Sequence, residues 1–367
     1  DKSVVGHLAA GVPGAVMGLW EAHQRFGTQP WADLVEPAIE LARGFEVVER
    51  QARSFRWGAE SFELFPEAAA TFLPGGAPAT EGDLFQQPDL AATLVRIRDL
   101  GPAGFYEGAT ADLIVAEMER GGGIITHEDL ASYRAAWREP IVFDYRDYTL
   151  ISMPPSSSGG ATMAEMANIL EAYDLGASGW NTPETVHLLA EAWRRAYADR
   201  NHYMADTDFV EVPIEELISE AYAARRRETI STTAATPSLE VGPGLEPVDR
   251  GSNTTHFSIV DPMGNAVAVT TTSNSCYGNK VVVEGAGFFL NNEMDDFAAK
   301  PGAPNQFGLV QGEANAVAAG KRMLSAMTPT VVLDPAGDLF MVTGTPGGST
   351  IITTTFQTIM NVVDHGM

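Results

Sequence analysis

The chain has 367 residues, of which 45% are hydrophobic and 19% charged, so it can bury a large core and is not an intrinsically disordered protein. Its 48 Asp and Glu against 23 Lys and Arg give a formal net charge of −25, which argues against a protein that binds nucleic acid or anionic membranes. No apolar run reaches the roughly 18 residues of a membrane span, and Cys276 is the only cysteine, which excludes a disulfide within the chain.

The first 230 residues or so have mostly helical patterns. Amphipathic segments at 20–26 and 34–42, and apolar residues at helical spacing within 88–100, predict three helices. Thr126 is an expected N-cap, because acidic residues follow it in the first turn. The run 182–184 predicts the start of a further helix that continues to about Met204, with Pro at its first helical position.

A strand and a linker interrupt this helical pattern. We expect one short strand at 141–153, after which the Pro- and Ser-rich run 154–160 breaks the chain and opens another helix. Residues 232–251 are rich in Thr, Pro, Gly and Ser and have no apolar period, which indicates an exposed linker or a mobile loop.

Beyond this linker the pattern changes to strands. Residues 255–260 alternate, 261–265 form a turn, and 266–272 are rich in β-branched residues, so a hairpin is predicted. Further strands are expected at 287–290, 328–333 and 339–342, the last of which leads into the glycine-rich run 344–349 and a helix. A polar stretch that leads directly into a hairpin beginning with Thr is the layout expected of an internal cleavage site.

The residues Asn253 and Thr254 suggest the chemistry of such a site. A threonine hydroxyl is a weak nucleophile unless a base lies beside it, and a free α-amine on the same residue, with a pKa of about 7.7–8.0, can be that base. Before cleavage the hydroxyl of Thr254 can attack the carbonyl of Asn253 and form an ester that water opens. On these residues alone, ordinary strand threonines are the favoured interpretation of Thr254 and Thr255, because short motifs often match by chance.

Nine short segments extend the pattern over essentially the whole chain: 11–14, 121–126, 153–160, 254–258, 264–270, 290–297, 315–317, 327–330 and 344–349. In these segments, and in their order, the sequence resembles the γ-glutamyltransferase family, also called glutathione hydrolases. The resemblance implies the αββα sandwich of N-terminal-nucleophile hydrolases, which is a mixed α/β fold with two stacked sheets between helical layers. Autocatalytic cleavage at Asn253–Thr254 would divide that domain into a large-subunit portion, 1–253, and a small-subunit portion, 254–367, which remain together as a heterodimer.

The resemblance also implies an activity. The family transfers the γ-glutamyl group of glutathione and related compounds, through an ester on Thr254, to water or to an amino acid or peptide. It needs no metal or organic cofactor, and no metal-ligand spacing stands out among the seven His residues. By resemblance the protein is periplasmic or secreted, although the sequence leaves a cytoplasmic location open.

Roles in the reaction can be transferred to matching positions. Thr254 resembles the nucleophile, and Thr272 would bond its hydroxyl or amine and hold its rotamer. Gly347 and Gly348 resemble an oxyanion hole, because backbone N–H groups without a neighbouring Cβ can approach a tetrahedral oxyanion closely.

Other positions match the residues that recognise the donor. Asn274, Glu293 and Asp296 would bind the α-amino group of the glutamyl donor, since carboxylates pair with an ammonium. Ser325 would bind the donor α-carboxylate. The family usually has a second serine next to it, where this chain has Ala326, so one hydroxyl donor is missing.

One further position concerns the edge of the site. Phe307 stands where some relatives have an aromatic lid residue, and its pattern fits loop packing equally well. The family's arginine for the donor carboxylate precedes segment 11–14, so we expect it outside this sequence, which resembles the interior of a longer protein.

Two alternatives stay open at this point. A glutaryl-type acylase of the same fold, acting for example on cephalosporins, would share Thr254 and the oxyanion glycines, but Glu293 and Asp296 suit an α-ammonium that a glutaryl group lacks. An uncleaved, inactive homologue that acts as a binding protein would not need the set of Thr254, Thr272, Gly347 and Gly348.

Overall fold

The chain forms two compact units, each built from two stretches of sequence. The computed structural model describes residues 2–242 and 254–367. The first unit comprises Asp1–Trp137 with Ser273–Met294, and the second comprises Arg138–Thr272 with Asp295–Met367. This division describes packing, whereas the predicted division after Asn253 describes the products of a cleavage and stays a prediction.

The first unit is mostly helical, as its apolar periodicity predicted. Its helices are α1 (Ala15–Phe26), α2 (Trp31–Arg43), α3 (Glu49–Phe62), α4 (Pro66–Phe72), α5 (Pro88–Leu100), α6 (Ala103–Tyr106), α7 (Gly108–Gly121) and α8 (His127–Ser132), with 3₁₀ turns η1 (His7–Ala9) and η2 (Pro74–Gly76) and the short antiparallel pair β1 (Phe45–Glu46) and β2 (Leu84–Phe85). Thr126 caps α8 by accepting the N–H of Asp129 at 3.2 Å, which confirms the predicted N-cap.

The predicted strand at 287–290 is wrong. The segment is irregular and makes one isolated bridge, between Val282 and Phe289. Gly287 has a φ of +76°, and a Cβ there would lie 2.4 Å from the backbone N of Leu90. The chain therefore follows the surface of α5 closely at this point instead of extending into a ladder.

The second unit is a mixed helix and sheet structure. Its helices are α9 (Gly159–Leu170), α10 (Leu175–Ser178), α11 (Pro183–Tyr203), α12 (Ile214–Leu217), α13 (Glu220–Arg227) and α14 (Ile351–Val363), with 3₁₀ turns η3 (Ser238–Glu240), η5 (Glu313–Asn315) and η6 (Gly348–Thr350). Its strands are β3 (Ile141–Tyr145), β4 (Tyr148–Ser152), β5 (Thr255–Val260), β6 (Ala266–Thr271), β7 (Thr330–Leu333) and β8 (Leu339–Thr343); the turn η4 (Glu293–Asp296) lies where the two units meet in sequence.

The single strand expected at 141–153 is two strands. β3 and β4 pair antiparallel, with Tyr145 opposite Tyr148. Arg146 adopts a φ of +56°, in the region used by tight hairpin turns, and this lets the chain reverse within two residues. This turn contains no glycine, so the sequence pattern predicted one continuous strand.

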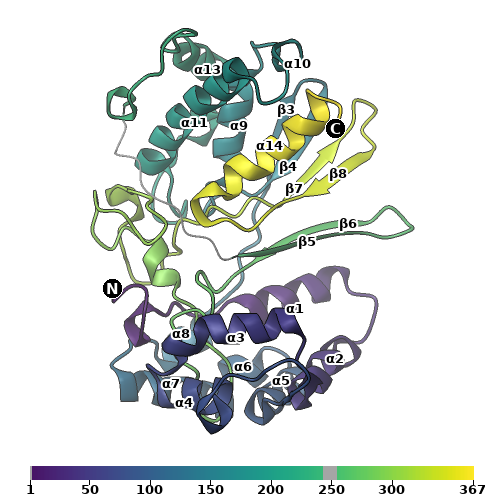
Figure 1. Cartoon of the computed structure of the whole chain (residues 1–367), viewed down its shortest axis with the longest axis vertical. Helices are drawn as coiled ribbons and strands as arrows, with labels where there is room; N and C mark the ends of the chain where they lie inside the picture. Colours follow the sequence, from purple (N-terminus) through teal and green to yellow (C-terminus); the bar gives the residue numbers. More distant parts are fainter. Residues whose placement is uncertain (1, 243–253) are drawn as a thin grey trace. The chain divides into compact units, whose positions relative to one another are not determined.

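The second unit is layered around a four-stranded antiparallel sheet in the order β3-β4-β7-β8 (Figure 1). Helix α9 packs on β3 and β4, and α11 and α14 pack on α9. The core between them is formed by residues such as Leu150, Val332 and Phe356, none of which is exposed to solvent. The β5–β6 hairpin contacts β7 and β8 and lies on the other side of the sheet from α9 and α14 (Figure 1). The Thr-initiated hairpin is thus held against the sheet.

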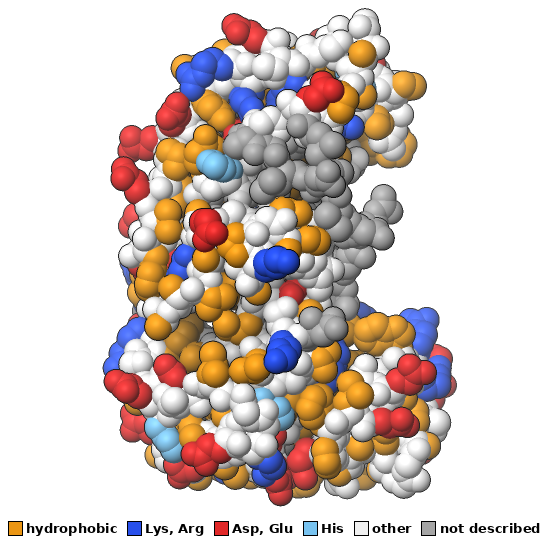
Figure 2. All heavy atoms as spheres, turned by 90° about the vertical axis from the view of Figure 1, so that its left-hand side faces the viewer, with side chains coloured by type: hydrophobic (Ala, Val, Ile, Leu, Met, Phe, Trp, Pro, Cys, Tyr) orange, Lys and Arg blue, Asp and Glu red, His pale blue; other side chains and the backbone are white. Residues whose placement is uncertain are grey.

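The acidic side chains are dispersed on the one face of the molecule that Figure 2 draws. On the face drawn in Figure 2, Asp and Glu side chains are scattered among basic, polar and hydrophobic ones and do not gather in one patch.

Candidate active site

The hairpin places Thr254 beside Thr272. Its turn is fixed by Asp261, whose Oδ1 accepts the N–H groups of Met263 and Asn265, each at 2.9 Å. The resulting register pairs Thr255 with Thr271. Thr254, immediately before β5, is therefore opposite Thr272, immediately after β6, and the Thr254 Oγ1 lies 3.5 Å from the Thr272 Oγ1. Of the predicted catalytic residues, these two are brought into direct contact.

His256 connects the hairpin to the glycine-rich run, a role that the sequence did not reveal. Its Nδ1 lies 2.9 Å from Thr270 Oγ1 and its Nε2 lies 3.0 Å from Ser258 Oγ. Burial lowers the pKa of His256. A Cβ on Gly344 would lie 2.3 Å from the imidazole, so only glycine can bring this loop so close to the hairpin.

The glycine-rich run ends in a tight turn at the start of α14. Gly347 and Gly348 have φ values of +154° and +54°, and a Cβ on Gly347 would lie 2.7 Å from Thr350 Oγ1. Thr350 donates its N–H and its hydroxyl to the Gly347 carbonyl at 3.0 and 2.9 Å, and the Tyr197 hydroxyl donates to the Ser349 carbonyl. The loop is rigidly built at a helix N-terminus, which is an arrangement suited to stabilising negative charge.

Asp296 is the predicted donor-binding carboxylate of the second unit. Desolvation, together with the neighbouring Asp295, raises the pKa of Asp296 to about 7, and the positive charge of Arg200 opposes that rise. The backbone carbonyl of Asp296 accepts from Asn315 Nδ2 at 2.7 Å and Gln311 Nε2 at 3.2 Å. A carboxyl that is held in place and poorly solvated is a candidate for binding a cation.

Ser325 is fixed by backbone contacts that leave its proton available. Its N–H donates to the Ser156 carbonyl at 3.0 Å, and its own carbonyl accepts the N–H and hydroxyl of Ser158 at 2.9 and 2.8 Å. Its Oγ accepts the N–H of Met327 at 2.9 Å, so the hydroxyl can still donate to a ligand oxygen. Ala326, which replaces the second serine expected from the family, is buried in the main core.

Asn274 and Glu293 belong to the first unit, where two asparagines hold their loops. Asn274 adopts a φ of +70° and donates from Nδ2 to the Asn292 carbonyl at 2.9 Å. The Glu293 N–H donates to Asn291 Oδ1 at 3.0 Å, and the same Oδ1 accepts the N–H of Gly11 at 2.9 Å. These contacts tie Glu293 to the predicted segment at 11–14.

Phe307 lies in the second unit, in a loop whose Asn305 Oδ1 accepts the Phe307 N–H at 3.0 Å. Its side chain is 6% exposed. The predicted lid role remains a prediction.

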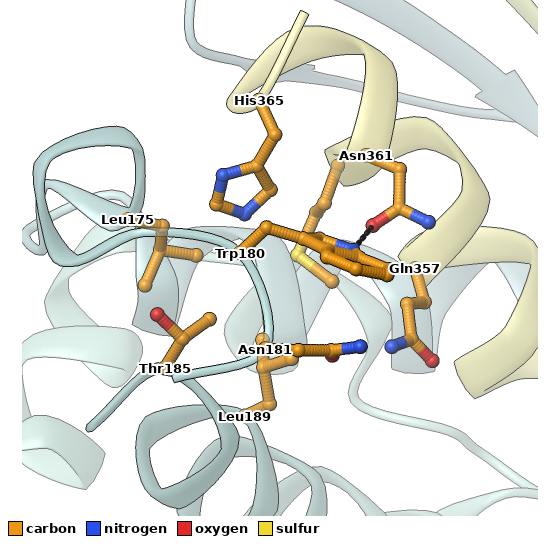
Figure 3. A pocket seen from close by; sticks show the side chains of 9 residues that line it. Leu175, Trp180, Asn181, Thr185, Leu189, Gln357, Asn361 and His365 are labelled. Carbon is orange, nitrogen blue, oxygen red and sulfur yellow. Dashed lines mark hydrogen bonds between the residues drawn. The ribbon is translucent and has the colours of Figure 1, made fainter. Parts of the chain in front are cut away.

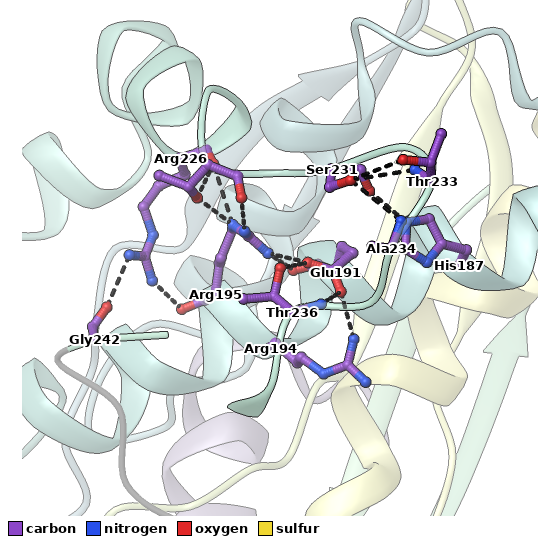
Figure 4. A network of polar contacts seen from close by, with 11 residues as sticks. His187, Glu191, Arg194, Arg195, Arg226, Ser231, Thr233, Ala234, Thr236 and Gly242 are labelled. Carbon is purple, nitrogen blue, oxygen red and sulfur yellow. Dashed lines mark hydrogen bonds and ion pairs between the residues drawn. The ribbon is translucent and has the colours of Figure 1, made fainter. Parts of the chain in front are cut away.

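A network of polar residues holds the chain upstream of the predicted cleavage site. Glu191 on α11 accepts the N–H and hydroxyl of Thr236 at 2.9 and 2.7 Å, and Arg226 Nη1 donates to the Gly242 carbonyl at 2.9 Å (Figure 4). Asn253, the residue predicted to be cleaved from Thr254, lies outside the described residues.

A small pocket between α10, α11 and α14 is separate from this chemistry. Figure 3 shows it lined by Leu175, Trp180, Asn181, Thr185, Leu189, Gln357, Met360, Asn361 and His365. It lies beside the C-terminal half of α14, whereas the glycine turn lies at the N-terminus of that helix. The six residue steps from Ile351 to Gln357 rise about 9 Å along the helix. The pocket contains no candidate nucleophile of the predicted reaction.

Among residues 2–242 and 254–367, no group of three or more His, Cys, Asp and Glu side chains is arranged to hold a metal ion. No helix in this part of the chain is both long and apolar enough to cross a membrane.

Comparisons with known proteins identify the family. The sequence profile of gamma-glutamyltranspeptidase matches residues 1–367. The chain is 48% identical to the glutathione hydrolase proenzyme of Pseudomonas aeruginosa over 99% of its length, and it spans 64% of the length of that relative.

Solved structures agree. The crystal structure of cephalosporin acylase from Bacillus halodurans covers 99% of the chain with a TM-score of 0.85 and 28% identity, and the match spans 64% of that chain. The match to the crystal structure of Helicobacter pylori gamma-glutamyltranspeptidase covers 68% of this chain and 72% of that chain, with a TM-score of 0.64 and 45% identity. These matches confirm the predicted mixed α/β fold class of N-terminal-nucleophile hydrolases. The chain belongs to the gamma-glutamyltranspeptidase family.

Proposed function

We propose that this protein is a γ-glutamyltransferase and glutathione hydrolase that matures by cutting itself before Thr254. The observation that carries the proposal is the 3.5 Å contact between Thr254 Oγ1 and Thr272 Oγ1 at the open end of the hairpin. It gives the residue that would become an N-terminus a hydroxyl partner that orients it.

The maturation step is an acyl shift followed by hydrolysis. The Thr254 hydroxyl oxygen attacks the Asn253 carbonyl carbon, the C–N bond breaks, and the Thr254 nitrogen takes the hydroxyl proton, which leaves an ester. Water then opens the ester to give the Asn253 carboxylate, the Thr254 hydroxyl and a free α-amine. The products would be a large and a small subunit that remain associated as a heterodimer.

The catalytic cycle would use the same oxygen. The α-amine of Thr254 accepts the hydroxyl proton while Oγ1 attacks the γ-carbonyl carbon of the donor, and the N–H groups of Gly347 and Gly348 stabilise the oxyanion. The proton passes to the leaving amine as the amide bond breaks. Water, or the amine of an amino acid or peptide, then attacks the ester and restores the hydroxyl.

Different residues would recognise the two charged groups of the donor, its α-ammonium and its α-carboxylate. Asp296, with Asn274 and Glu293, would bind the α-ammonium of the glutamyl group, and the Ser325 hydroxyl would donate to its α-carboxylate. These groups would fit the γ-glutamyl part of glutathione. The names of the relatives, which are glutathione hydrolases, also support glutathione as the donor.

The second candidate is a glutaryl-type acylase, which the likeness to a cephalosporin acylase favours. It would keep Thr254 and the glycine turn but would not need an ammonium-binding carboxylate. The raised pKa of Asp296, in a site that desolvates it beside Asp295, favours the γ-glutamyl donor instead, because a bound ammonium would relieve that repulsion.

The test is to compare two chromogenic amides on the purified protein. We expect γ-glutamyl-p-nitroanilide to be turned over with a kcat/KM at least about tenfold above that of glutaryl-p-nitroanilide, which lacks only the α-ammonium. The reverse preference would assign the protein to the acylases. An unprocessed chain that turns over neither amide would support a non-catalytic binding protein.

Export is the final part of the proposal. By resemblance to its bacterial relatives, the mature heterodimer would act in the periplasm or outside the cell. Activity towards γ-glutamyl-p-nitroanilide in the periplasmic or culture fraction would support this, and activity confined to the cytoplasmic fraction would contradict it.

A further inference from the structure

Arg200 is a buried cation that the proposed reaction does not use. It lies in the last turn of α11 and is 1% exposed. Among the described residues it forms no ion pair within 4.0 Å, and its Nη2 has no hydrogen-bond partner. A buried guanidinium with an unsatisfied nitrogen costs free energy, and burial lowers the pKa of Arg200. Its neighbours explain why the fold keeps it.

One side of Arg200 supports Ser325. Its Nε donates to Ser158 Oγ at 2.8 Å, and that hydroxyl donates to the Ser325 carbonyl, also at 2.8 Å. All three residues are buried. A two-bond chain therefore runs from the guanidinium to the backbone of the serine proposed to bind the donor carboxylate.

The other side of Arg200 supports the loop that follows Asp296. Arg200 Nη1 donates to Asn201 Oδ1 at 3.0 Å, and the Asn201 carbonyl accepts the N–H of Gly312 at 3.1 Å. The flanking Gln311 side chain donates to the Asp296 carbonyl at 3.2 Å. This end of α11 therefore holds the polypeptide around Asp296 as well.

The charges around Asp296 give Arg200 a second role. In the described part of the chain, the charged groups that act on Asp296 are Asp295, which raises its pKa, and Arg200, which lowers it. The titratable groups that act on Arg200 are the Tyr197 hydroxyl, on its own helix, and the Asp296 carboxyl. An ammonium ligand needs Asp296 ionised, and Arg200 is the group that favours ionisation.

We propose that Arg200 is a positioning residue of the donor pocket: it anchors the loops of Asp296 and Ser325 to α11, and its positive charge favours the ionised form of Asp296. This inference rests on the proposed γ-glutamyl donor site. It predicts that Arg200 sets the pH range of donor binding without touching the donor.

The test compares Arg200→Gln, Arg200→Lys and the wild type in steady-state kinetics with γ-glutamyl-p-nitroanilide, from about pH 5 to about pH 9. Arg200→Gln should move the acid limb of kcat/KM upwards by about one pH unit and raise KM about tenfold at pH 7, with a much smaller change in kcat at high pH. Arg200→Lys restores the charge and should return the acid limb towards its wild-type position. Arg194→Gln, on the same helix but in the Glu191 network, should leave the limb unchanged.

Two further variants keep the test decisive if Arg200→Gln fails to fold. Asp295→Asn removes the opposing charge and should move the acid limb downwards. Ser158→Ala breaks the chain to Ser325 and should raise KM without moving the limb. Folded Arg200→Gln with a wild-type limb, or an unmoved limb in Asp295→Asn, would overturn the proposal. Wild-type protein without γ-glutamyl turnover would instead refute the proposed function itself.

Discussion

Glu191 and Asp296, two carboxylates of the same unit, have opposite environments. Glu191 Oε1 accepts from Arg194 at 2.6 Å and from the Thr236 N–H at 2.9 Å. Its Oε2 accepts from Arg195 and from the Thr236 hydroxyl, each at 2.7 Å. The Asp296 carboxyl, by contrast, receives one long contact from the described residues, 3.5 Å from Asn305 Nδ2.

The pKa values follow these environments. Desolvation would raise the pKa of Glu191, but the hydrogen bonds from Thr236 and Arg195 outweigh it and lower the pKa below its usual value. Desolvation and Asp295 raise the pKa of Asp296 to about 7. Among the described residues, Glu191 is fully hydrogen-bonded and the Asp296 carboxyl is not, which is the difference expected between a structural carboxylate and the proposed binding carboxylate.

The two carboxylates also have opposite linkage to pH. Glu191, with a lowered pKa, stabilises the folded protein above its unfolded pKa of about 4.3, and this contribution is lost as pH falls through the folded pKa. Asp296, with a raised pKa, binds its proton more tightly when folded, so its contribution falls as pH rises from about 4 towards 7. Substitutions at Glu191 and at Asp296 should therefore have different effects on stability and activity.

The largest effect is expected at the nucleophile that Asp296 would serve. Thr254→Ala removes the hydroxyl, so neither the acyl shift nor the glutamyl ester can form, and activity should fall by at least about 10⁴-fold with the precursor uncleaved. Denaturing gels and γ-glutamyl-p-nitroanilide turnover measure both.

The matched control is Thr255→Ala, at the neighbouring exposed position of β5. It should cleave and react. Should Thr255→Ala stay intact while Thr254→Ala is cleaved, the nucleophile has been placed one residue too early. Thr254→Ser keeps a hydroxyl and should mature more slowly, since losing the methyl frees χ1.

The second largest effect concerns stability alone. Glu191→Ala leaves the buried Arg195 without its carboxylate and should destabilise the folded protein by about 3–5 kcal/mol. Chemical denaturation measures this, and kcat/KM of the protein that remains folded should stay within about twofold of wild type. A large loss of kcat/KM at unchanged stability would show that Glu191 belongs to the donor site.

The third effect, at Asp296, is expected on activity and not as a loss of stability. Asp296→Asn removes a charge-assisted hydrogen bond to the donor, worth about 1.5–3 kcal/mol, so kcat/KM should fall about 10- to 150-fold, mainly through KM. The same substitution should raise Tm above pH 7, because it removes a carboxylate that is costly to ionise. Precursor cleavage should be unaffected. A variant with wild-type kcat/KM would remove Asp296 from the donor site.

The smallest effect is expected from restoring a missing donor. Ala326→Ser adds the hydroxyl that relatives usually have next to Ser325, and a net hydrogen bond of about 1 kcal/mol would lower KM about fivefold. Ala326 is 8% exposed, so the new hydroxyl has to find a partner. An increase in KM would mean that the hydroxyl is buried without a partner rather than presented to the donor.

The parts of this structure that the sequence predicted are those set by local pattern. The bounds expected for α5 agree with its range Pro88–Leu100, and both strands of the Thr-initiated hairpin were found, because periodicity and turn residues determine them. The β3–β4 hairpin was missed, because its turn uses Arg146 rather than glycine.

Contacts between distant residues could not be predicted in this way. Thr236 and Glu191 are 45 residues apart, and Ser158 and Arg200 are 42 apart, so no local pattern connects them. The candidate site residues were identified by resemblance to a family, whereas the contacts of His256 and Arg200 became visible only in the fold.

The most direct test of the central claim is N-terminal sequencing of the polypeptides in purified, active protein. The account predicts two chains, one of which begins Thr254-Thr255-His256 and carries the γ-glutamyl ester when a slow donor is trapped on it. An intact chain that turns over γ-glutamyl-p-nitroanilide, or a new N-terminus at any other residue, would contradict it.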